Sequence, residues 1–327
     1  GYGEIAPLPG LHKETLQDVD ALLAGVGPEL EGKIFERFGA LADNVANRIA
    51  ASAPRGDFGA PSAVFGLQCA AASVFAQAEG TTPAWILSKK PRPHVTVNAL
   101  FIGDATEAAE AIASGTLDAY PSVKVKVGRG SVSAERELLK VLLSGLDEAV
   151  TLRIDGNRKL TLEEAVARFK GLPPERIEYL EEPLADPAQL VDLHAATGLT
   201  MGLDETLYVP GLKHVGRASY VSAWVLKAAR VGHWKRLLFL SKEAKEHGAV
   251  SVVSSCLESG LGLGWQIQMA AALPGTVAAA GLGTESWLRI DTVAPAYDSS
   301  RGYVRINDWS GTPSAPVLGK LRFKRVG

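Results

Sequence analysis

The stretch Ser122-Val-Lys-Val-Lys-Val-Gly128 places two lysines inside a run of valines. Valine-rich runs are typical of strands buried on both faces, and a charge in such a strand is costly unless it is paired or bound to a metal. Side chains two residues apart on a strand share a face, so Lys124 and Lys126 are predicted to project into one cavity. A solvated edge strand is the alternative, but the alternating valines favour an interior strand.

Later apolar runs end in a charged residue at the same end of the run. These residues are Asp155, Glu181, Asp204 and Lys227. Asp155 precedes Gly156-Asn157, so a turn or helix N-cap role is an equal alternative for it. Glu182-Pro183 and Asp204-Glu205 read alternatively as a strand terminator and a turn. Because the charge recurs in strand after strand, with acids between lysines, we favour a single site.

Short apolar runs alternate with amphipathic segments from about residue 94. The predicted strands cover residues 94–101, 123–127, 150–154, 177–180, 200–203, 223–226, 250–254 and 278–282. Helical patterns lie between them, at 104–114, 131–143 and 233–247, and Thr161-Leu-Glu-Glu164 predicts a capping box. Eight strand–helix alternations predict an α/β fold, a modified TIM barrel of the (β/α)7β type.

The two ends of the chain lack this alternation and predict a smaller α+β capping domain. Residues 1–92 are assigned to it, with helical patterns at 13–23, 30–49 and 63–78, and residues 1–4 resemble the end of a strand. The barrel is assigned residues 93–285. Residues 286–327, with a short strand at 302–306, are expected to return to the capping domain. The chain does not begin with Met, and the first capping strand is expected to be missing.

Composition excludes several classes of partner. The 327 residues carry a formal net charge of −2 without a basic stripe, so no nucleic-acid partner is expected. No apolar run is long enough to span a bilayer, so no membrane partner is expected. Cys69 and Cys256 predict buried free thiols in a reducing compartment, the cytoplasm. Monomer and homo-oligomer both stay open.

In the predicted barrel, the three strand-end acids are expected to lie close together. Catalytic groups of such barrels lie at the C-terminal ends of the strands, and adjacent strands lie roughly 4.8 Å apart. Asp155, Glu181 and Asp204 end three neighbouring strands, so they are expected at one level around one ion. Three carboxylates without a nearby His or Cys select a hard cation. We therefore predict Mg²⁺, with Mn²⁺ as a substitute.

The lysines are expected on opposite sides of that metal. The unperturbed pKa of lysine is roughly 10.4, too high for a base at neutral pH. A second lysine and a divalent cation would both lower it. The metal would also hold a substrate carboxylate and stabilise the enediolate formed when the adjacent C–H bond loses its proton. The pattern thus predicts metal-assisted proton abstraction from a small carboxylate.

Together these motifs resemble the enolase superfamily, in its muconate-lactonizing subgroup. The matching pieces are Lys124-Val-Lys126, Asp155-Gly-Asn157, Glu181-Glu-Pro183, Asp204-Glu205 and Lys227. More narrowly, residues 1–10, residues 62–66 and Ser254-Ser-Cys-Leu-Glu-Ser-Gly-Leu-Gly262 resemble the o-succinylbenzoate synthase family. The resemblance covers nearly the whole chain. A lysine base beside Mg²⁺ is a known arrangement of enolase-superfamily sites.

The resemblance implies a lyase of menaquinone or phylloquinone synthesis. It would dehydrate 2-succinyl-6-hydroxy-2,4-cyclohexadiene-1-carboxylate to o-succinylbenzoate by syn elimination. Lys126 would be the base, Lys124 would tune it, and Lys227 would stabilise the dienolate by cation–π attraction. The metal ligands would be Asp155, Glu181 and Asp204. Supporting contacts to the metal ligands or the substrate are expected from Asn157, Glu205 and Arg153. Ser254 and Ser255 would hold the succinyl carboxylate through hydroxyls or amides, although a polar strand end is nearly as good an interpretation of these two serines.

Two rival functions stay open. An N-acylamino acid racemase or dipeptide epimerase would use Lys126 and Lys227 on opposite faces of its substrate. Dipeptide epimerases tend to carry Asp-x-Asp at the eighth strand, where this chain has Gly281-Leu-Gly-Thr-Glu285, and the role of Glu285 is left open. The rival of another class is a non-catalytic barrel, which the intact acids and lysines disfavour. The mobile loop that the family places near the first capping strand is not seen in the sequence.

Overall fold

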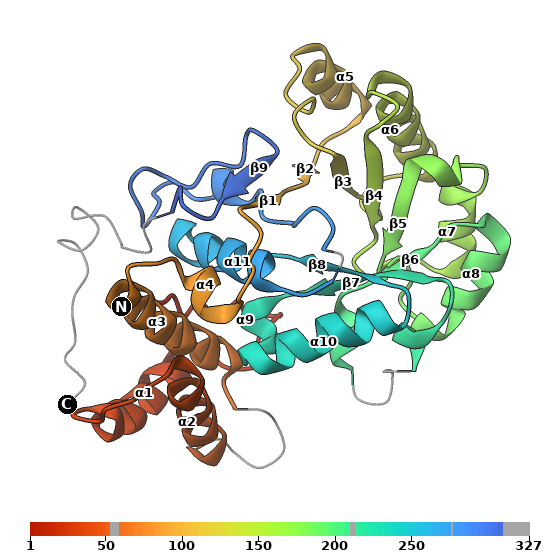
Figure 1. Ribbon diagram of the computed structural model, residues 1–327. Helices are drawn as coiled ribbons and strands as arrows, with labels where there is room; N and C mark the ends of the chain where they lie inside the picture. Colours follow the sequence, from red (N-terminus) through yellow and green to blue (C-terminus); the bar gives the residue numbers. More distant parts are fainter. Residues whose placement is uncertain (53–58, 210–213, 276, 310–327) are drawn as a thin grey trace.

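A curled parallel sheet forms the centre of the computed structural model, which describes residues 1–52, 59–209, 214–275 and 277–309 (Figure 1). Its seven strands pair in chain order and are all parallel. They are β2 (Ala99–Phe101), β3 (Ser122–Lys126), β4 (Thr151–Asp155), β5 (Ile177–Glu181), β6 (Met201–Leu203), β7 (Val221–Leu226) and β8 (Val250–Val253). The α/β class and the barrel-like sheet agree with the prediction.

The predicted eighth strand, residues 278–282, is not a regular strand. It is represented by isolated bridges: Val277 and Gly281 pair with Ser251 and Ser254, and Ala280 pairs with Val97 ahead of β2. The Asn98 amide donates to the Ala280 carbonyl at 2.9 Å. The segment is rich in alanine and glycine, which are depleted in strands. It therefore joins the two edges of the sheet without forming a continuous ladder.

The first predicted strand, residues 94–101, belongs to two sheets. Its start is β1 (His94–Thr96), which pairs antiparallel with β9 (Tyr303–Arg305). Its end is β2, the first strand of the barrel. The predicted strand at 302–306 is thus confirmed as β9, and it pairs with β1. The change of partner occurs at Asn98, which is buried and accepts a hydrogen bond from Arg153 inside the barrel.

Helices and short helical turns connect the strands on the outside of the sheet (Figure 1). The α-helices are α5 (Ala105–Ala113), α6 (Val132–Gly145), α7 (Leu162–Phe169), α8 (Leu190–Thr197), α9 (Ala228–Val231), α10 (Trp234–Glu246) and α11 (Gly260–Ala272). The 3-10 turns are η1 (Pro174–Arg176), η2 (Pro187–Gln189), η3 (Glu205–Tyr208), η4 (Val215–Arg217) and η5 (Glu285–Trp287). The capping box at Thr161 is confirmed, since its hydroxyl accepts from the Glu164 amide at 3.2 Å and its amide donates to Glu164 at 3.0 Å.

Four helices precede the barrel: α1 (Leu16–Leu30), α2 (Phe38–Ser52), α3 (Pro61–Glu79) and α4 (Pro83–Leu87). The single helix expected at 30–49 is wrong at its start, because residues 31–37 are not helical. The strand expected at residues 1–4 is also wrong. This segment crosses α3 instead, so closely that a Cβ on Gly3 would lie 1.8 Å from the carbonyl oxygen of Gly66. The division into a capping domain and a barrel stays a prediction.

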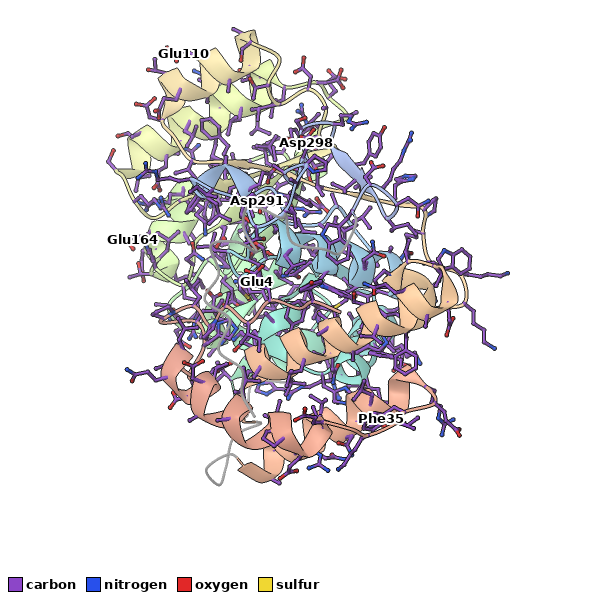
Figure 2. The ribbon with its side chains drawn as sticks, turned by 90° about the vertical axis from the view of Figure 1, so that its left-hand side faces the viewer. Glu4, Phe35, Glu110, Glu164, Asp291 and Asp298 are labelled. Carbon is purple, nitrogen blue, oxygen red and sulfur yellow. The ribbon has the colours of Figure 1, made fainter. Side chains whose placement is uncertain are left out.

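The N-terminal segment is anchored to the barrel through α11. Glu4 accepts from the amides of Ser259 and Gly262, each at 2.9 Å, and Asp291 accepts from the Gly260 amide at 2.7 Å. Figure 2 shows Glu4 and Asp291 in the middle of the molecule, whereas Glu110 and Glu164 lie at its periphery. Carboxylates stabilise a helix N-terminus because its first amides lack partners within the helix. No helix in the described ranges is long and apolar enough to cross a membrane.

Candidate active site

A cavity of about 330 Å³ opens at the C-terminal ends of the barrel strands. Most of the residues singled out from the sequence line it: Lys124, Lys126, Asp155, Asn157, Glu205, Lys227, Ser254 and Ser255. Glu181 and Asp204 are 1% exposed and contact the lining lysines from beneath. Residues from six different strands or strand ends thus meet at one place.

Lysines and acids form a continuous ion-pair network at the floor of the cavity. Lys124 Nζ lies 2.6 Å from Glu181 Oε1 and 2.9 Å from Asp155 Oδ2. Lys126 Nζ lies 3.1 Å from the same Asp155 oxygen and donates to Asn157 Oδ1 at 2.6 Å. Both lysines therefore approach one carboxylate oxygen, as expected for side chains that share a face of β3.

The three acids are not all in strand register. Lys126, Asp155 and Glu181 are paired neighbours across β3, β4 and β5, but the partner of Glu181 on β6 is Gly202. Asp204 lies two residues further along, just before η3. There it pairs with Lys227 Nζ. The expected common level therefore holds for two acids, and Asp204 reaches the site from beyond the end of its strand.

Glu182 fixes the position of Asp204. Its Oε1 accepts from the amides of Asp204 and Thr206, both at 2.8 Å, and its Oε2 accepts from the Thr206 hydroxyl at 2.8 Å. The sequence pointed only to a strand terminator at Glu182-Pro183. The structure shows a buried carboxylate with a positive φ of 38° that ties the end of β5 to the start of η3. This role depends on contacts with Asp204 and Thr206, 22 and 24 residues further along the chain, which a local pattern does not predict.

Burial and neighbouring charges set the pKa values of the acids in opposite directions. Burial alone would raise the pKa of Asp155, but Lys124 and Lys126 lower it to about 2. Burial raises the pKa of Glu181 to about 7; Asp155 and Asp204 add to this, although Lys124 opposes it. Burial opposes the charge on Lys124, yet Asp155 and Glu181 raise its pKa well above the usual range. Lys124 thus stays an ammonium beside Lys126.

The donor set fits a hard divalent cation. Within the described ranges no group of three His, Cys, Asp or Glu side chains is arranged to hold a metal ion, and the three acids instead pair with lysines. Yet Asp204 Oδ1 and Glu205 Oε2 are buried carboxylate oxygens without a hydrogen-bond partner among the described residues. A buried unpaired carboxylate oxygen is costly. Because all the available donors are oxygens, Mg²⁺ is the matching ion.

Arg153 lies inside the barrel and does not line the cavity. Its guanidinium is 1% exposed, pairs with Glu178 at 2.7 Å, donates to the Ala279 carbonyl at 2.6 Å and lies 5.2 Å from the Tyr179 ring centroid. The contact with substrate expected for Arg153 stays untested. Through these contacts Arg153 on β4 links β5 and the segment at Ala279 in the barrel interior.

The remaining predicted residues have different surroundings. Asn157 has a φ of 45°, and its amide donates to Asp155 Oδ1 at 2.9 Å, so it holds both Asp155 and Lys126. The Ser255 hydroxyl lies 3.0 Å from the Thr284 hydroxyl, and Ser254 faces the Gly281 carbonyl at 3.4 Å. Glu285 is absent from the cavity wall and accepts from the Ser299 amide at 3.1 Å.

Part of the cavity wall was not foreseen. An apolar side comes from Leu8, Leu11, Leu100, Leu257 and Trp287, and Arg129 and Cys256 also line the cavity. Leu8 and Leu11 precede α1, so the N-terminal region contributes to a site built mainly by the barrel. Leu257 has a φ of 67°, an unusual value for a bulky residue that is associated with functional sites. No local sequence signal marks these apolar residues.

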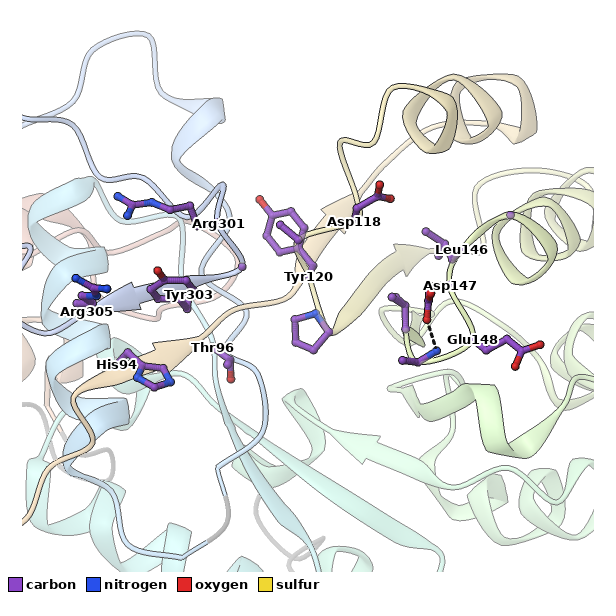
Figure 3. A pocket seen from close by; sticks show the side chains of 16 residues that line it. His94, Thr96, Asp118, Tyr120, Leu146, Asp147, Glu148, Arg301, Tyr303 and Arg305 are labelled. Atoms are coloured by element: carbon purple, nitrogen blue, oxygen red, sulfur yellow. Dashed lines mark hydrogen bonds between the residues drawn. The ribbon is translucent and has the colours of Figure 1, made fainter.

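A larger cleft lies at the opposite end of the barrel (Figure 3). Its volume is about 1180 Å³, and its walls include His94, Arg301 and Tyr303 on one side and Asp147 and Glu148 on the other. These residues lie on the β1–β9 pair, just before β9 or before β4, at the N-terminal ends of the strands. Because catalytic groups of such barrels lie at the other end, we assign the site to the smaller cavity.

Comparison with known proteins agrees with this geometry. The family model described as "Enolase C-terminal domain-like" matches residues 104–313. Among solved structures, the dipeptide epimerase from Enterococcus faecalis V583 superposes with a TM-score of 0.79 at 19% identity, covering 93% of this chain and 87% of that one. Muconate cycloisomerase from Pseudomonas fluorescens superposes with a TM-score of 0.78 at 20% identity, covering 93% and 84%. The chain therefore belongs to the enolase superfamily.

Sequence relatives narrow this class. The o-succinylbenzoate synthase of Pasteurella multocida is 30% identical over 273 residues, which cover 80% of this chain and 72% of that protein. The o-succinylbenzoate synthase of Yersinia pseudotuberculosis serotype I is 30% identical over 306 residues, covering 91% and 83%. The chain is thus an enzyme of the o-succinylbenzoate synthase family. A dipeptide epimerase structure with the same fold was solved with Mg and a dipeptide.

Proposed function

We propose that this enzyme catalyses the syn-dehydration of 2-succinyl-6-hydroxy-2,4-cyclohexadiene-1-carboxylate to o-succinylbenzoate, a step of menaquinone or phylloquinone synthesis. The observation that carries the proposal is the placement of Lys126 and Lys227. Both line one cavity at the C-terminal end of the barrel, and each pairs with a different acid, Asp155 and Asp204 respectively. The named relatives supply the choice of substrate.

In this proposal Lys126 takes the proton from the ring carbon that bears the carboxylate. A carbon–carbon double bond forms towards the neighbouring carbon, and the carbon–oxygen bond to the hydroxyl group breaks. Lys126, now an ammonium, returns its proton to the departing hydroxyl, which leaves as water. Asp155 and Asn157 hold Lys126 in place, and Lys124, which is bound to the same Asp155 oxygen, is proposed to tune it.

Lys227 acts on the planar intermediate by attraction between its ammonium and the ring. Its amide donates to the Tyr208 hydroxyl at 3.2 Å, and its ammonium pairs with Asp204. Ser254 and Ser255 are proposed to contact the succinyl group through their hydroxyls. Asp155, Glu181 and Asp204, with Glu205 beside them, would hold a divalent cation, Mg²⁺ or Mn²⁺. When bound, this cation supplies positive charge that stabilises the anion formed from the carboxylate substrate.

The test is an absorbance assay with purified protein. With Mg²⁺ present, the diene absorbance of the substrate is expected to fall as o-succinylbenzoate accumulates, and removal of the cation by EDTA should stop the reaction. Re-addition of Mg²⁺ should restore it. If the diene persists while the protein rapidly exchanges the α proton of N-acylated amino acids, the synthase proposal is wrong and racemisation replaces it.

The second candidate is N-acylamino acid racemisation or dipeptide epimerisation. It is favoured by the presence of lysines on two different strand ends, Lys126 and Lys227, which would serve opposite faces of a stereocentre. The fold neighbours include a dipeptide epimerase and an N-succinyl Arg/Lys racemase. Their identity to this chain is below 20%, so they support the fold alone. The assay described above distinguishes between the two candidate substrates.

A further inference from the structure

Arg129 is a cation of the cavity wall that the proposed reaction does not use. It lies three residues beyond Lys126, in the loop between β3 and α6, and its side chain is exposed at the cavity. Arg129 therefore belongs to the wall of the same cavity and takes part in none of the ion pairs at the cavity floor.

The backbone around Arg129 is held firmly. The buried Glu135 accepts from the amides of Arg129 at 2.8 Å and Gly130 at 2.9 Å, and it pairs with Arg168 at 2.5 Å. Arg168 in turn donates to the Gly130 carbonyl at 3.0 Å. Gly128 has a φ of 76°, which lets the chain turn sharply out of β3. The loop is thus ordered before any ligand binds, which lowers the entropic cost of binding.

Among the described residues, no acid forms an ion pair with Arg129. Lys124, Lys126 and Lys227 each pair with a carboxylate at the cavity floor. Among the described residues, the guanidinium of Arg129 has neither an ion-pair partner nor a hydrogen-bond acceptor, although its amide is bonded to Glu135. An arginine at a cavity without a protein partner is suited to bind an anionic ligand, since its planar group can take a carboxylate through two hydrogen bonds.

We propose that Arg129 is a specificity-determining residue that binds a second carboxylate of the substrate, remote from the carboxylate held near the lysines. This inference rests on the proposed function and deepens it, because o-succinylbenzoate carries a carboxylate on its ring and another at the end of its succinyl chain. The apolar wall formed by Leu257 and Trp287 covers the ring and the chain between these two charges. The enzyme thus recognises a dicarboxylate with an apolar middle.

The test compares two ligands that differ only at the remote end. o-Succinylbenzoate has the second carboxylate, whereas 2-butanoylbenzoate carries a methyl group there. Calorimetric titration in the presence of Mg²⁺ is expected to show that Arg129→Met weakens o-succinylbenzoate binding by about tenfold or more. Binding of 2-butanoylbenzoate should change by less than about twofold. Arg129→Lys should recover part of the loss, because it restores the charge without the planar geometry.

Turnover provides a second measurement. Arg129→Met is expected to raise KM for the diene substrate more than it lowers kcat, since Arg129 contacts a part of the substrate that does not react. The matched control is Arg301→Met, which removes the same charge from an exposed site at the opposite end of the barrel. It should leave both ligands and both kinetic constants unchanged.

Each other result overturns the inference. Equal loss of affinity for both ligands would mean that Arg129 only supports the cavity, and no loss for o-succinylbenzoate would mean that the second carboxylate binds elsewhere. In both cases the wild-type enzyme still turns over the diene, so the proposed function survives. If wild-type protein neither binds o-succinylbenzoate nor turns over the diene, the proposed function and the inference fail together.

Discussion

Asp155 has to satisfy two lysines at once. Its Oδ2 lies 2.9 Å from Lys124 and 3.1 Å from Lys126, and its Oδ1 accepts from the Asn157 amide at 2.9 Å. Burying one of these charges alone would be costly, but each of them has an opposite charge within 3.1 Å. Lys124 also pairs with Asp155. The proposed base, Lys126, can therefore gain or lose a proton without leaving the buried Asp155 carboxylate unpaired.

Lys126→Ala is the corresponding prediction. Turnover of the diene should fall by at least about a hundredfold, the usual scale for loss of a positioned base. The melting temperature should change little, because Asp155 keeps its contact with Lys124. Steady-state absorbance assays and thermal unfolding measure the two quantities. Lys140→Ala, which alters an exposed side chain on α6, is the control, and substantial activity in the Lys126 variant would make the assignment of the base wrong.

At the scale of elements, the site depends on how strands end. Asp155 on β4 and Glu181 on β5 are paired neighbours in the sheet. By contrast, β6 ends at Leu203, and its acid, Asp204, lies at the start of the following turn, η3. Glu182 accepts the amides of that turn and joins the end of β5 to it. Burial raises the pKa of Glu182 to about 7, against the effect of its hydrogen bonds with Thr206 and Asp204. The connection between two neighbouring strand ends is thus a polar contact inside the core.

We predict that Glu182→Ala destabilises the fold by about 3 kcal/mol, since it leaves two buried amides and one buried hydroxyl without their acceptor. It should also weaken cation binding, because Asp204 loses the contact that fixes its amide. Urea unfolding and Mg²⁺ titration of the folded variant measure these effects. Glu163→Ala on the exposed face of α7 should shift stability by less than about 0.5 kcal/mol. A stable Glu182 variant with normal Mg²⁺ affinity would contradict this role.

At the scale of the whole molecule, the partly buried Glu4 joins the N-terminal segment to α11, close to the buried Glu258. Glu258 accepts from the Cys256 amide at 2.6 Å and from Gln266 Nε2 at 2.9 Å, and Glu4 lies close enough to affect its ionisation. Burial raises the pKa of Glu258 to about 7, and Glu4 adds to the effect. The Gln266 carbonyl oxygen is buried without a partner among the described residues, so a protonated Glu258 would supply the missing donor once the amide rotates.

Glu258 should make the stability of the protein depend on pH. The unfolded chain loses this proton near pH 4.5 and the folded chain near pH 7, so the folded state binds more protons between these values. The contribution of Glu258 is therefore most favourable below about pH 4.5 and decreases as the pH rises to about 7, by up to roughly 3 kcal/mol.

Glu258→Gln removes this contribution and keeps the size of the side chain. Compared with wild type, the variant should gain stability at pH 8 relative to pH 5, because its amide stays neutral and can donate to a rotated Gln266. Thermal unfolding of both proteins across this range at fixed ionic strength measures the difference. Glu110→Gln on α5 is the exposed control. Parallel pH profiles for wild type and the Glu258 variant would show that Glu258 titrates as it does in the unfolded chain.

The order of the strands and the polar residues of the cavity floor could be predicted from local sequence patterns. Alternating valines, strand-end acids and a capping box are local patterns, and parallel strands bring their C-terminal ends together whatever the details. Lys124, Lys126, Asp155 and Lys227 could therefore be placed in one cavity from spacing alone. The choice of o-succinylbenzoate as product came from resemblance and from the named relatives.

The neighbours that complete that cavity could not be predicted from local patterns, because they come from distant parts of the folded chain. The pairing of β1 with β9, the bridged segment at 277–281 and the path of Leu8 and Leu11 across the barrel mouth depend on contacts between residues far apart in sequence. The period of the hydrophobic residues indicates which face of a helix or strand is buried. It does not indicate which other segment of the chain packs against that face. The unmatched charge of Arg129 and the bracing by Glu182 became visible for the same reason: a partner, or its absence, is a property of three-dimensional neighbours.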